Sequence, residues 1–403
     1  MNSILIFHDN SCSSSILIKK IVENTFSEIV IEDKTKVKIF SPAVLESFIK
    51  EEEIHEHNIF GNQLQSIKTL SGGEQKKALL QYLIHEQPEI LLLDNPFDHL
   101  DAQSQQELHH TLKDISTKVQ LVLLLSRKKD IPDFMTKKYL ANNNKLSAYK
   151  EFSKSTFVND SITIPKPIEA QHYNDTYLIQ CKEISVSYGN KHILKNINWN
   201  IKPGEFWQLT GPNGSGKTTL LSMITGDNVK GYGQELYLFG HKKGSGESVW
   251  ELKKNIGYFT TNLTQQFTGR YTAIEMIIGG FFDAVGLYNK PTEVQLKIAS
   301  QWLSVMGLEN FEKTYFKELS LGYQRMIMIA RAMVKHPLLL ILDEPTTGLD
   351  EDNVRILVNF INKIAAESTT AILYVSHRKE EGLTPKYHFT LSPSENGSTG
   401  KIH

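Results

Sequence analysis

The chain contains an internal repeat, which restricts its fold more than any other feature because two similar copies must form the same kind of unit. Leu70–Gln75 reads LSGGEQ, and Leu319–Gln324 reads LSLGYQ 249 residues later. The runs EILLLDNP, which ends at Pro96, and LLLILDEP, which ends at Pro345, are also 249 residues apart. The shared register predicts two homologous halves in tandem.

We place the two halves at residues 1–150 and 176–403, with a linker at residues 151–175. The stretch from Leu140 to Asp175 is rich in Asn, Ser, Lys and Pro, a composition typical of a segment that runs over the surface and buries little. It lacks the long charged helical pattern of a rigid coiled-coil spacer. We also predict that the tail from Glu395 to His403 is disordered.

Each half alternates short apolar runs with segments of helical periodicity. Val119–Leu125 and Ala371–Val375 have the length and composition of parallel strands that are covered on both faces. Asp352–Ile364 carries apolar residues at helical spacing, so we expect a helix before the last of these strands. The pattern predicts a doubly wound α/β fold with a mostly parallel sheet in each half.

The second half carries a complete phosphate-binding motif, G-x-x-x-x-G-K-[ST]. It follows the apolar run Phe206–Leu209 and opens a helical run, which is the context that this motif requires. Its backbone N–H groups can cradle phosphates at the helix N-terminus, Lys217 can reach the β- and γ-phosphates, and the Thr218 hydroxyl can bind Mg²⁺. The predicted nucleotide-binding residues are Gly211, Pro212, Asn213, Gly214, Ser215, Gly216, Lys217, Thr218 and Thr219.

Two carboxylates follow the apolar run that ends at Leu342. A strand end there would direct Asp343 toward a metal ion and place Glu344 to orient or deprotonate an attacking water. His377 follows the next apolar strand. Two interpretations of this histidine are open, a contact with the γ-phosphate and a purely structural role. We therefore predict Glu344, Lys217 and His377 as catalytic residues, Thr218 and Asp343 as metal ligands, and ATP with Mg²⁺ as the bound species.

Along the second half, the phosphate-binding motif is followed by LSLGYQ, then by the Asp343–Glu344 pair and His377. This ordered set of motifs resembles the ATP-binding cassette (ABC) ATPase family. The resemblance covers nearly all of residues 177–403 and much of residues 1–130. Within that family the chain looks most like the soluble tandem proteins of the ModF type. The resemblance implies P-loop nucleotide-binding domains with helical subdomains that pack head to tail, so that each ATP lies between one P-loop and the other half's LSGGQ signature. It implies that Tyr188 stacks on adenine. It also implies nucleotide contacts from the first-half signature residues Ser71, Gly72, Gly73 and Glu74.

The first half resembles a degenerate cassette. Ser14 stands at the position of the P-loop lysine, Asn95 at that of the catalytic glutamate, and Arg127 at that of the histidine. The loop thereby loses the cation that reaches phosphate, and an amide cannot accept the proton of a water. We predict one productive composite site, formed by the second-half P-loop with the first-half signature, and one silent site.

The first cassette is also abbreviated. From Ser14 to Leu70 the chain advances 56 residues, whereas from Lys217 to Leu319 it advances 102. In the family this region carries a small antiparallel sheet and a helical subdomain. In the second half, Thr261 stands where the family has a glutamine that links nucleotide to a permease, with Gln265 and Gln266 just beyond it.

Composition restricts the remaining possibilities. The 44 basic and 45 acidic residues give no basic footprint for nucleic acid, which argues against a translation factor of the ABC-F class. Two cysteines cannot form a disulfide framework, and no apolar run reaches the roughly 18 residues of a membrane helix. We predict a cytoplasmic ATPase, with peripheral association at the inner membrane as an alternative. Its partner would be a permease or another protein, and the competing function is a nucleotide-gated interaction or regulatory module with slow turnover.

Overall fold

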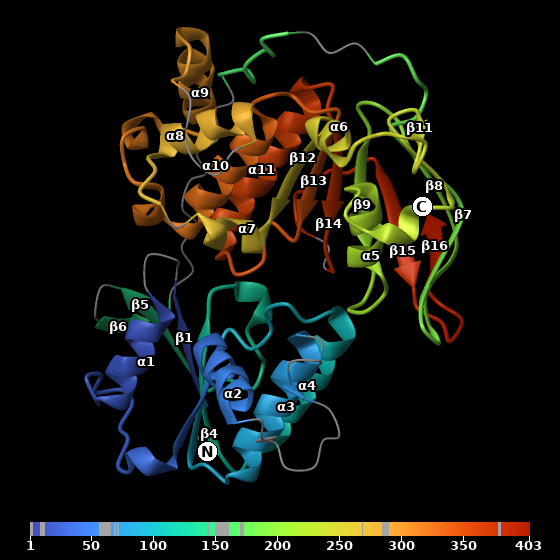
Figure 1. The fold of residues 1–403 in the computed structure, drawn as a ribbon. Helices are drawn as coiled ribbons and strands as arrows, with labels where there is room; N and C mark the ends of the chain where they lie inside the picture. The colour runs from blue at the N-terminus through green and yellow to red at the C-terminus, as the bar shows by residue number, and fades with distance from the viewer. Residues whose placement is uncertain are drawn as a thin grey trace. The chain divides into compact units, whose positions relative to one another are not determined.

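The computed structural model describes residues 3–8, 13–55, 66–67, 70, 72–142, 145–149, 161–169, 173–267, 269–283, 290–377 and 380–403. They form two compact units, which Figure 1 colours from blue to red along the chain. The first unit comprises Met1–Lys154 with Thr347–Asp352, and the second comprises Ser155–Thr346 with Asn353–His403. Within the described residues, no helix has the length and apolar composition needed to cross a membrane.

Each unit is built on a six-stranded sheet, and the two sheets have the same topology. The strand order is β2-β3-β4-β1-β5-β6 in the first and β12-β13-β14-β9-β15-β16 in the second. All neighbouring strands are parallel except the last pair of each sheet. The predicted α/β fold of two tandem cassettes is confirmed. The first sheet consists of β1 (Ile4–Phe7), β2 (Val37–Phe40), β3 (Ile90–Asp94), β4 (Gln120–Leu125), β5 (Lys137–Asn142) and β6 (Lys145–Ala148). The second consists of β9 (Phe206–Thr210), β12 (Ile256–Thr260), β13 (Leu339–Asp343), β14 (Ala371–Val375), β15 (Tyr387–Ser392) and β16 (Thr399–Ile402).

The backbone conformation repeats as well as the strand order. Left-handed φ values recur at equivalent residues that are 249 positions apart. These pairs are Gln87 (φ 49°) with His336 (φ 50°), Asn95 (φ 41°) with Glu344 (φ 49°), and His99 (φ 62°) with Gly348 (φ 73°). Residues other than glycine adopt this conformation rarely, so its recurrence shows that both halves keep the same turns although their side chains differ.

Helices and apolar side chains cover both faces of the first sheet. Alternate strand residues face opposite ways, so Leu91 and Leu123 belong to one buried cluster and Leu92 and Val122 to the other. Near-continuous apolar strands are expected when both faces are covered. The helices of this unit are α1 (Ser14–Val22), α2 (Pro42–His55), α3 (Gly72–His85) and α4 (Ala102–Ile115).

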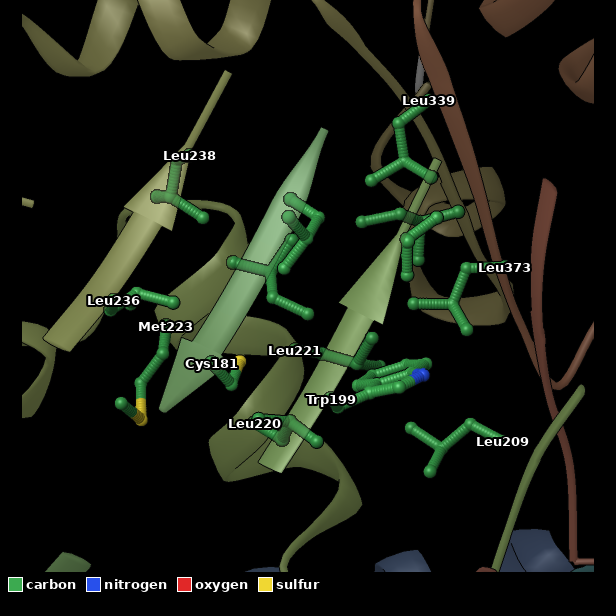
Figure 2. Packing of buried hydrophobic residues seen from close by; sticks show 14 of the residues in the cluster. Cys181, Trp199, Leu209, Leu220, Leu221, Met223, Leu236, Leu238, Leu339 and Leu373 are labelled. Atoms are coloured by element: carbon green, nitrogen blue, oxygen red, sulfur yellow. The ribbon is translucent and has the colours of Figure 1, made fainter. Parts of the chain in front are cut away.

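The second unit adds an antiparallel sheet with the order β11-β10-β7-β8. Its strands are β7 (Ile179–Tyr188), β8 (Lys191–Ile201), β10 (Glu235–Leu238) and β11 (His241–Lys242). Trp199 of β8 stacks on Phe389 of β15 with ring centroids 4.5 Å apart. Leu220 and Leu221 of α5 (Lys217–Ile224) complete the same apolar core, part of which Figure 2 shows. This core fixes the helix that opens at the phosphate-binding motif.

A helical region separates β12 from β13 in the second unit. It contains α7 (Thr261–Gln266), α8 (Ala273–Ile278), α9 (Glu293–Val305) and α10 (Leu321–Met333), whereas α6 (Val249–Lys254) precedes β12 and α11 (Glu351–Glu367) follows β13. Between β2 and α3 of the first unit, α2 is the one α-helix within the described residues, and they contain no counterpart of the antiparallel sheet. The first cassette is therefore abbreviated, as predicted.

Two predictions about irregular segments are wrong. The stretch from residue 140 is not linker throughout, because β5 and β6 pair there and complete the first sheet. Further on, Ile164 is buried and its N–H donates to Glu367 at 2.8 Å. The C-terminal tail is not disordered, because β16 pairs with β15. Polar composition misled both predictions, since backbone pairing at a sheet edge does not require apolar side chains. The domain boundaries stay predictions, because residues 150–160 and 170–172 lie outside the described part of the chain.

Candidate functional site

The phosphate-binding loop lies between β9 and α5, and its glycines are required by its geometry. Gly214 (φ 76°) and Gly216 (φ 89°) have left-handed backbone conformations. A Cβ on Gly216 would lie 2.7 Å from Cδ2 of Leu194, and one on Gly211 would lie 2.8 Å from the carbonyl oxygen of Leu391. Glycine therefore permits both the turn and its close packing on the neighbouring strands.

Two polar side chains of the loop fit a bound polyphosphate. Lys217 is buried, and its Nζ donates to the carbonyl oxygens of Gly211 at 2.7 Å and Pro212 at 3.0 Å. The Ser215 hydroxyl is buried and has no hydrogen-bond partner within the described residues. An orphaned buried donor beside a helix N-terminus is a group that a phosphate oxygen would satisfy. Asn213, Gly214 and Thr218 are exposed, and Pro212 and Thr219 are half-buried.

Asp343 is the last residue of β13, and the charges of Glu344 and Lys217 both affect the pKa of its carboxyl. Burial raises the pKa of Asp343 to about 6; the Glu344 carboxylate adds to the rise and the Lys217 ammonium opposes it. The Asp343 carboxyl therefore lies within electrostatic reach of the Lys217 ammonium group. Burial disfavours the ionised form of the Asp343 carboxyl, whereas a bound divalent cation would favour it. The Asp343 carboxylate and the Thr218 hydroxyl are oxygen donors, which fit Mg²⁺.

Glu344 and His377 lie at the ends of adjacent strands and contact each other. Nδ1 of His377 is 2.9 Å from Oε1 of Glu344. The Glu344 N–H donates to the carbonyl oxygen of Val375 at 2.9 Å, which holds its left-handed backbone in place. The His377 side chain is 4% exposed and that of Glu344 is 24% exposed. The carboxylate is thus fixed by the imidazole and still accessible to water.

Tyr188 is the last residue of β7, and the residue is 46% exposed. Its hydroxyl accepts a hydrogen bond from Nδ2 of Asn228 at 2.9 Å. No sequence motif pointed to Asn228, which lies in the loop after α5 and becomes recognisable only from this contact.

The equivalent positions of the first unit hold a different network. Ser14 Oγ donates to Asp94 at 2.8 Å, and Asn95 Nδ2 donates to the same carboxylate at 3.2 Å. Asn95 Oδ1 accepts from the N–H of Ser126 at 3.0 Å and from its hydroxyl at 3.1 Å. Burial raises the pKa of Asp94, opposed by the Ser14 hydrogen bond. Hydroxyl and amide groups thus occupy the places of the lysine, glutamate and histidine.

The strand register corrects one assignment. Asp94 pairs with Leu124, whereas Asp343 pairs with Val375, so the last two strands correspond at a separation of 251 residues. The counterpart of His377 is therefore Ser126, and the prediction that Arg127 stands there is wrong. With either assignment, the first half lacks an imidazole at the position of His377.

The first-half signature lies at the start of α3. Gly72, Gly73 and Glu74 form its first turn, and Ser71 lies outside the described residues. Both signature glutamines donate to a backbone carbonyl that precedes their helix: Gln75 to that of Ile67 at 2.9 Å, and Gln324 to that of Leu319 at 2.8 Å. Thr261, in place of the coupling glutamine, begins α7, and the side chains of Gln265 and Gln266 are outside the described part.

Solved structures with the same architecture support the tandem fold. The chain matches the structure of RNase-L Inhibitor with a TM-score of 0.61 at 16% identity, over 99% of this chain and 85% of that one. It also matches a chain in the crystal structure of archaeal ribosomal stalk protein aP1 with ribosome recycling factor aABCE1, with a TM-score of 0.61 at 15% identity and the same coverage. At these identities the likeness concerns the fold alone.

Sequence comparison identifies the family. Residues 194–347 match the family model described as ABC transporter. The chain is 38% identical to ABC transporter ATP-binding protein ModF of Escherichia coli (strain K12) over 332 residues, which are 78% of this chain and 68% of that protein. It is 32% identical to the uncharacterized ABC transporter ATP-binding protein C323.04 of Schizosaccharomyces pombe over 335 residues, 78% of this chain and 66% of that one. The chain thus spans about two thirds of the length of these relatives, and it belongs to the family of ABC transporter ATP-binding proteins.

Proposed function

We propose that this protein binds and hydrolyses ATP at the phosphate-binding loop of its second half. The observation that carries the proposal is the Glu344–His377 contact at the end of the strands that also deliver Asp343. A histidine-held carboxylate next to a complete P-loop is an arrangement suited to orienting water for attack on a phosphate. The family to which the chain belongs consists of ATP-binding proteins, which agrees with this assignment.

Each residue has a distinct task in the proposed reaction. Lys217 exchanges its two loop carbonyls for β- and γ-phosphate oxygens and stabilises the charge that develops on them. Glu344 accepts a hydrogen bond from the attacking water and takes its proton as the bond between γ-phosphorus and the bridging oxygen breaks. The products are ADP and phosphate. Thr218 and Asp343 would hold Mg²⁺, which when bound neutralises charge on the phosphate oxygens.

We further propose that the first half completes this site and does not hydrolyse ATP itself. The support comes from the sequence: the intact P-loop and the consensus-like signature, Ser71–Glu74, occur in different halves. Ser14 offers no cation for phosphate, and the Asn95 amide offers no base at the position of Glu344. One productive and one silent composite site would explain why the two halves have diverged in complementary ways.

A nucleotide-gated interaction or regulatory module is the second candidate. Thr261 favours it, because a threonine at the start of α7 is shorter than the glutamine that links nucleotide to a permease in this family. In that case ATP closes the protein on a partner and turnover only resets it. Steady-state turnover with and without a candidate permease or other protein partner separates a transport-associated ATPase from this module, since only coupling to transport predicts stimulation by a permease.

The direct test of the site is phosphate release from ATP by the purified protein with Mg²⁺. Lys217→Ala should reduce turnover to less than about a tenth of the original, because a tenfold loss corresponds to only about 1.4 kcal/mol of transition-state stabilisation. Ser14→Ala, the matched change in the first half, should leave turnover nearly unchanged. Retention of more than about a tenth of the activity by Lys217→Ala would overturn the assignment of the P-loop.

A further inference from the structure

The exposed ring of Tyr188 is held in place by two residues that belong to no recognised motif. Asn228 Nδ2 donates to the Tyr188 hydroxyl at 2.9 Å, and Nζ of Lys230 lies 5.5 Å from the centroid of the ring. A half-exposed tyrosine without such contacts would exchange between rotamers. Here the ring has one anchored edge and a cation on one face.

Asn228 also binds the helix that begins at the phosphate-binding loop. Its N–H donates to the carbonyl oxygen of Ser222 at 2.9 Å, and its Nδ2 donates to the Ser222 hydroxyl at 3.0 Å. Its Oδ1 accepts from the N–H of Lys230 at 3.0 Å. Both amide hydrogens and the amide oxygen are thus engaged, which allows a single side-chain orientation. Ser222 lies in α5 five residues after Lys217, so Asn228 joins the ring to the phosphate-binding helix.

The ammonium group of Lys230 lies over the ring of Tyr188. An ammonium group at 5.5 Å from the centroid occupies one face through a cation–π contact. Tyr188 is 46% exposed, so a planar ligand can reach the residue. A base stacked there would have its distance from the phosphates set by the Asn228 bridge and not by the mobility of the tyrosine.

We propose that Asn228 is a positioning residue that makes the site select ligands carrying both an aromatic base and a polyphosphate. The inference rests on the proposed function, because it takes the loop at Lys217 to hold the phosphates. It assigns the preference for a nucleoside triphosphate over inorganic triphosphate to a bridge of two hydrogen bonds between Tyr188 and Ser222. The bridge acts on the base through Tyr188 and leaves phosphate binding to the loop.

The test compares the affinities of ATP and inorganic triphosphate, measured by competition against a fluorescent ATP analogue. Tyr188→Phe removes the hydroxyl and keeps the ring, and Asn228→Leu removes the bridge at similar volume. Each should weaken ATP about fivefold to tenfold while triphosphate changes less than about twofold, as expected for one lost hydrogen bond. The double variant should match the single variants, because both remove the same contact. Tyr232→Phe, which removes the hydroxyl of another exposed tyrosine, is the control and should change neither affinity.

The outcomes separate this inference from the proposed function. If ATP and triphosphate weaken equally in Asn228→Leu, Asn228 only supports the loop, and the inference is overturned. If the unaltered protein binds triphosphate as tightly as ATP, Tyr188 contributes no base contact, and the inference fails while the phosphate site stands. If the unaltered protein binds neither ligand, the proposed function fails first. Thermal unfolding of each variant confirms that a loss of affinity is not a loss of fold.

Discussion

Nδ1 of His377 contacts Oε1 of Glu344 at 2.9 Å, and the equivalent positions of the first half are bridged by Ser126 and Asn95. The two pairs join the same two strand ends, and Glu344 and Asn95 share a left-handed backbone that side chains other than glycine rarely adopt. The turn is therefore kept in both halves. In the second half a carboxylate contacts an imidazole, and in the first half an amide accepts hydrogen bonds from a serine.

The buried Asp343 should make the stability of the metal- and nucleotide-free protein depend on pH. Its folded-state pKa is raised from 3.8 to about 6, so the folded protein binds this proton more tightly than the unfolded chain does. The contribution of Asp343 to the free energy of unfolding is therefore fully present below about pH 4 and is lost as the pH rises through about 6. For a pKa shift of about two units the loss is about 3 kcal/mol. In denaturant unfolding, Asp343→Asn should be more stable than the unaltered protein at pH 7 and similar at pH 4. The same pH dependence in both proteins would show that Asp343 ionises freely.

Ser14→Lys should not create a second active site. The new lysine would break the Ser14–Asp94 hydrogen bond, and Asn95 would still be unable to accept a proton. Groups that act as a unit do not restore activity one at a time. Phosphate release at saturating ATP should stay within experimental error of the unaltered protein, and a doubling of turnover would contradict the account of the silent half.

The two signatures should respond differently to the same substitution. Ser71→Arg in the first half should abolish hydrolysis, because the proposal has this signature complete the site at Lys217 and an arginine would block its approach. Ser320→Arg, in the second-half signature, should weaken ATP-dependent closure and leave measurable turnover. Both proteins are compared at saturating ATP after their folding is verified. If Ser320→Arg is inactive and Ser71→Arg is active, the pairing of P-loop and signature is wrong.

The sequence predicted the features that depend on local pattern. The glycines of the loop, the strand before it and the carboxylates after β13 follow from backbone geometry within a few residues. The counterpart of His377 was placed one residue too far along because the chain between the two strands differs in length. The helix α11 is three residues longer than α4 and the loop after it is one residue shorter, so the offset rises from 249 to 251. A length change inside a helix is not visible from motifs at its two ends.

Other features depend on contacts that no motif encodes. Asn228 binds Tyr188, 40 residues earlier, through a loop whose sequence resembles an ordinary turn. The strand β16 pairs with β15 although Thr399, Gly400 and Lys401 are polar or small. A side chain at Gly400 would clash with the ring of Phe389. These contacts arise from the tertiary fold, and the local sequence does not predict them.

The most direct measurement of the central claim is the turnover and ATP occupancy of Glu344→Gln. The amide keeps the shape of the side chain and cannot take the proton of the attacking water, so hydrolysis should fall by at least about a hundredfold. ATP should then remain intact in a complex with Mg²⁺ and one protein molecule, while Asn95→Asp in the first half should hydrolyse ATP at the original rate. Normal turnover by Glu344→Gln would contradict the claim that this carboxylate orients the water in the second-half site.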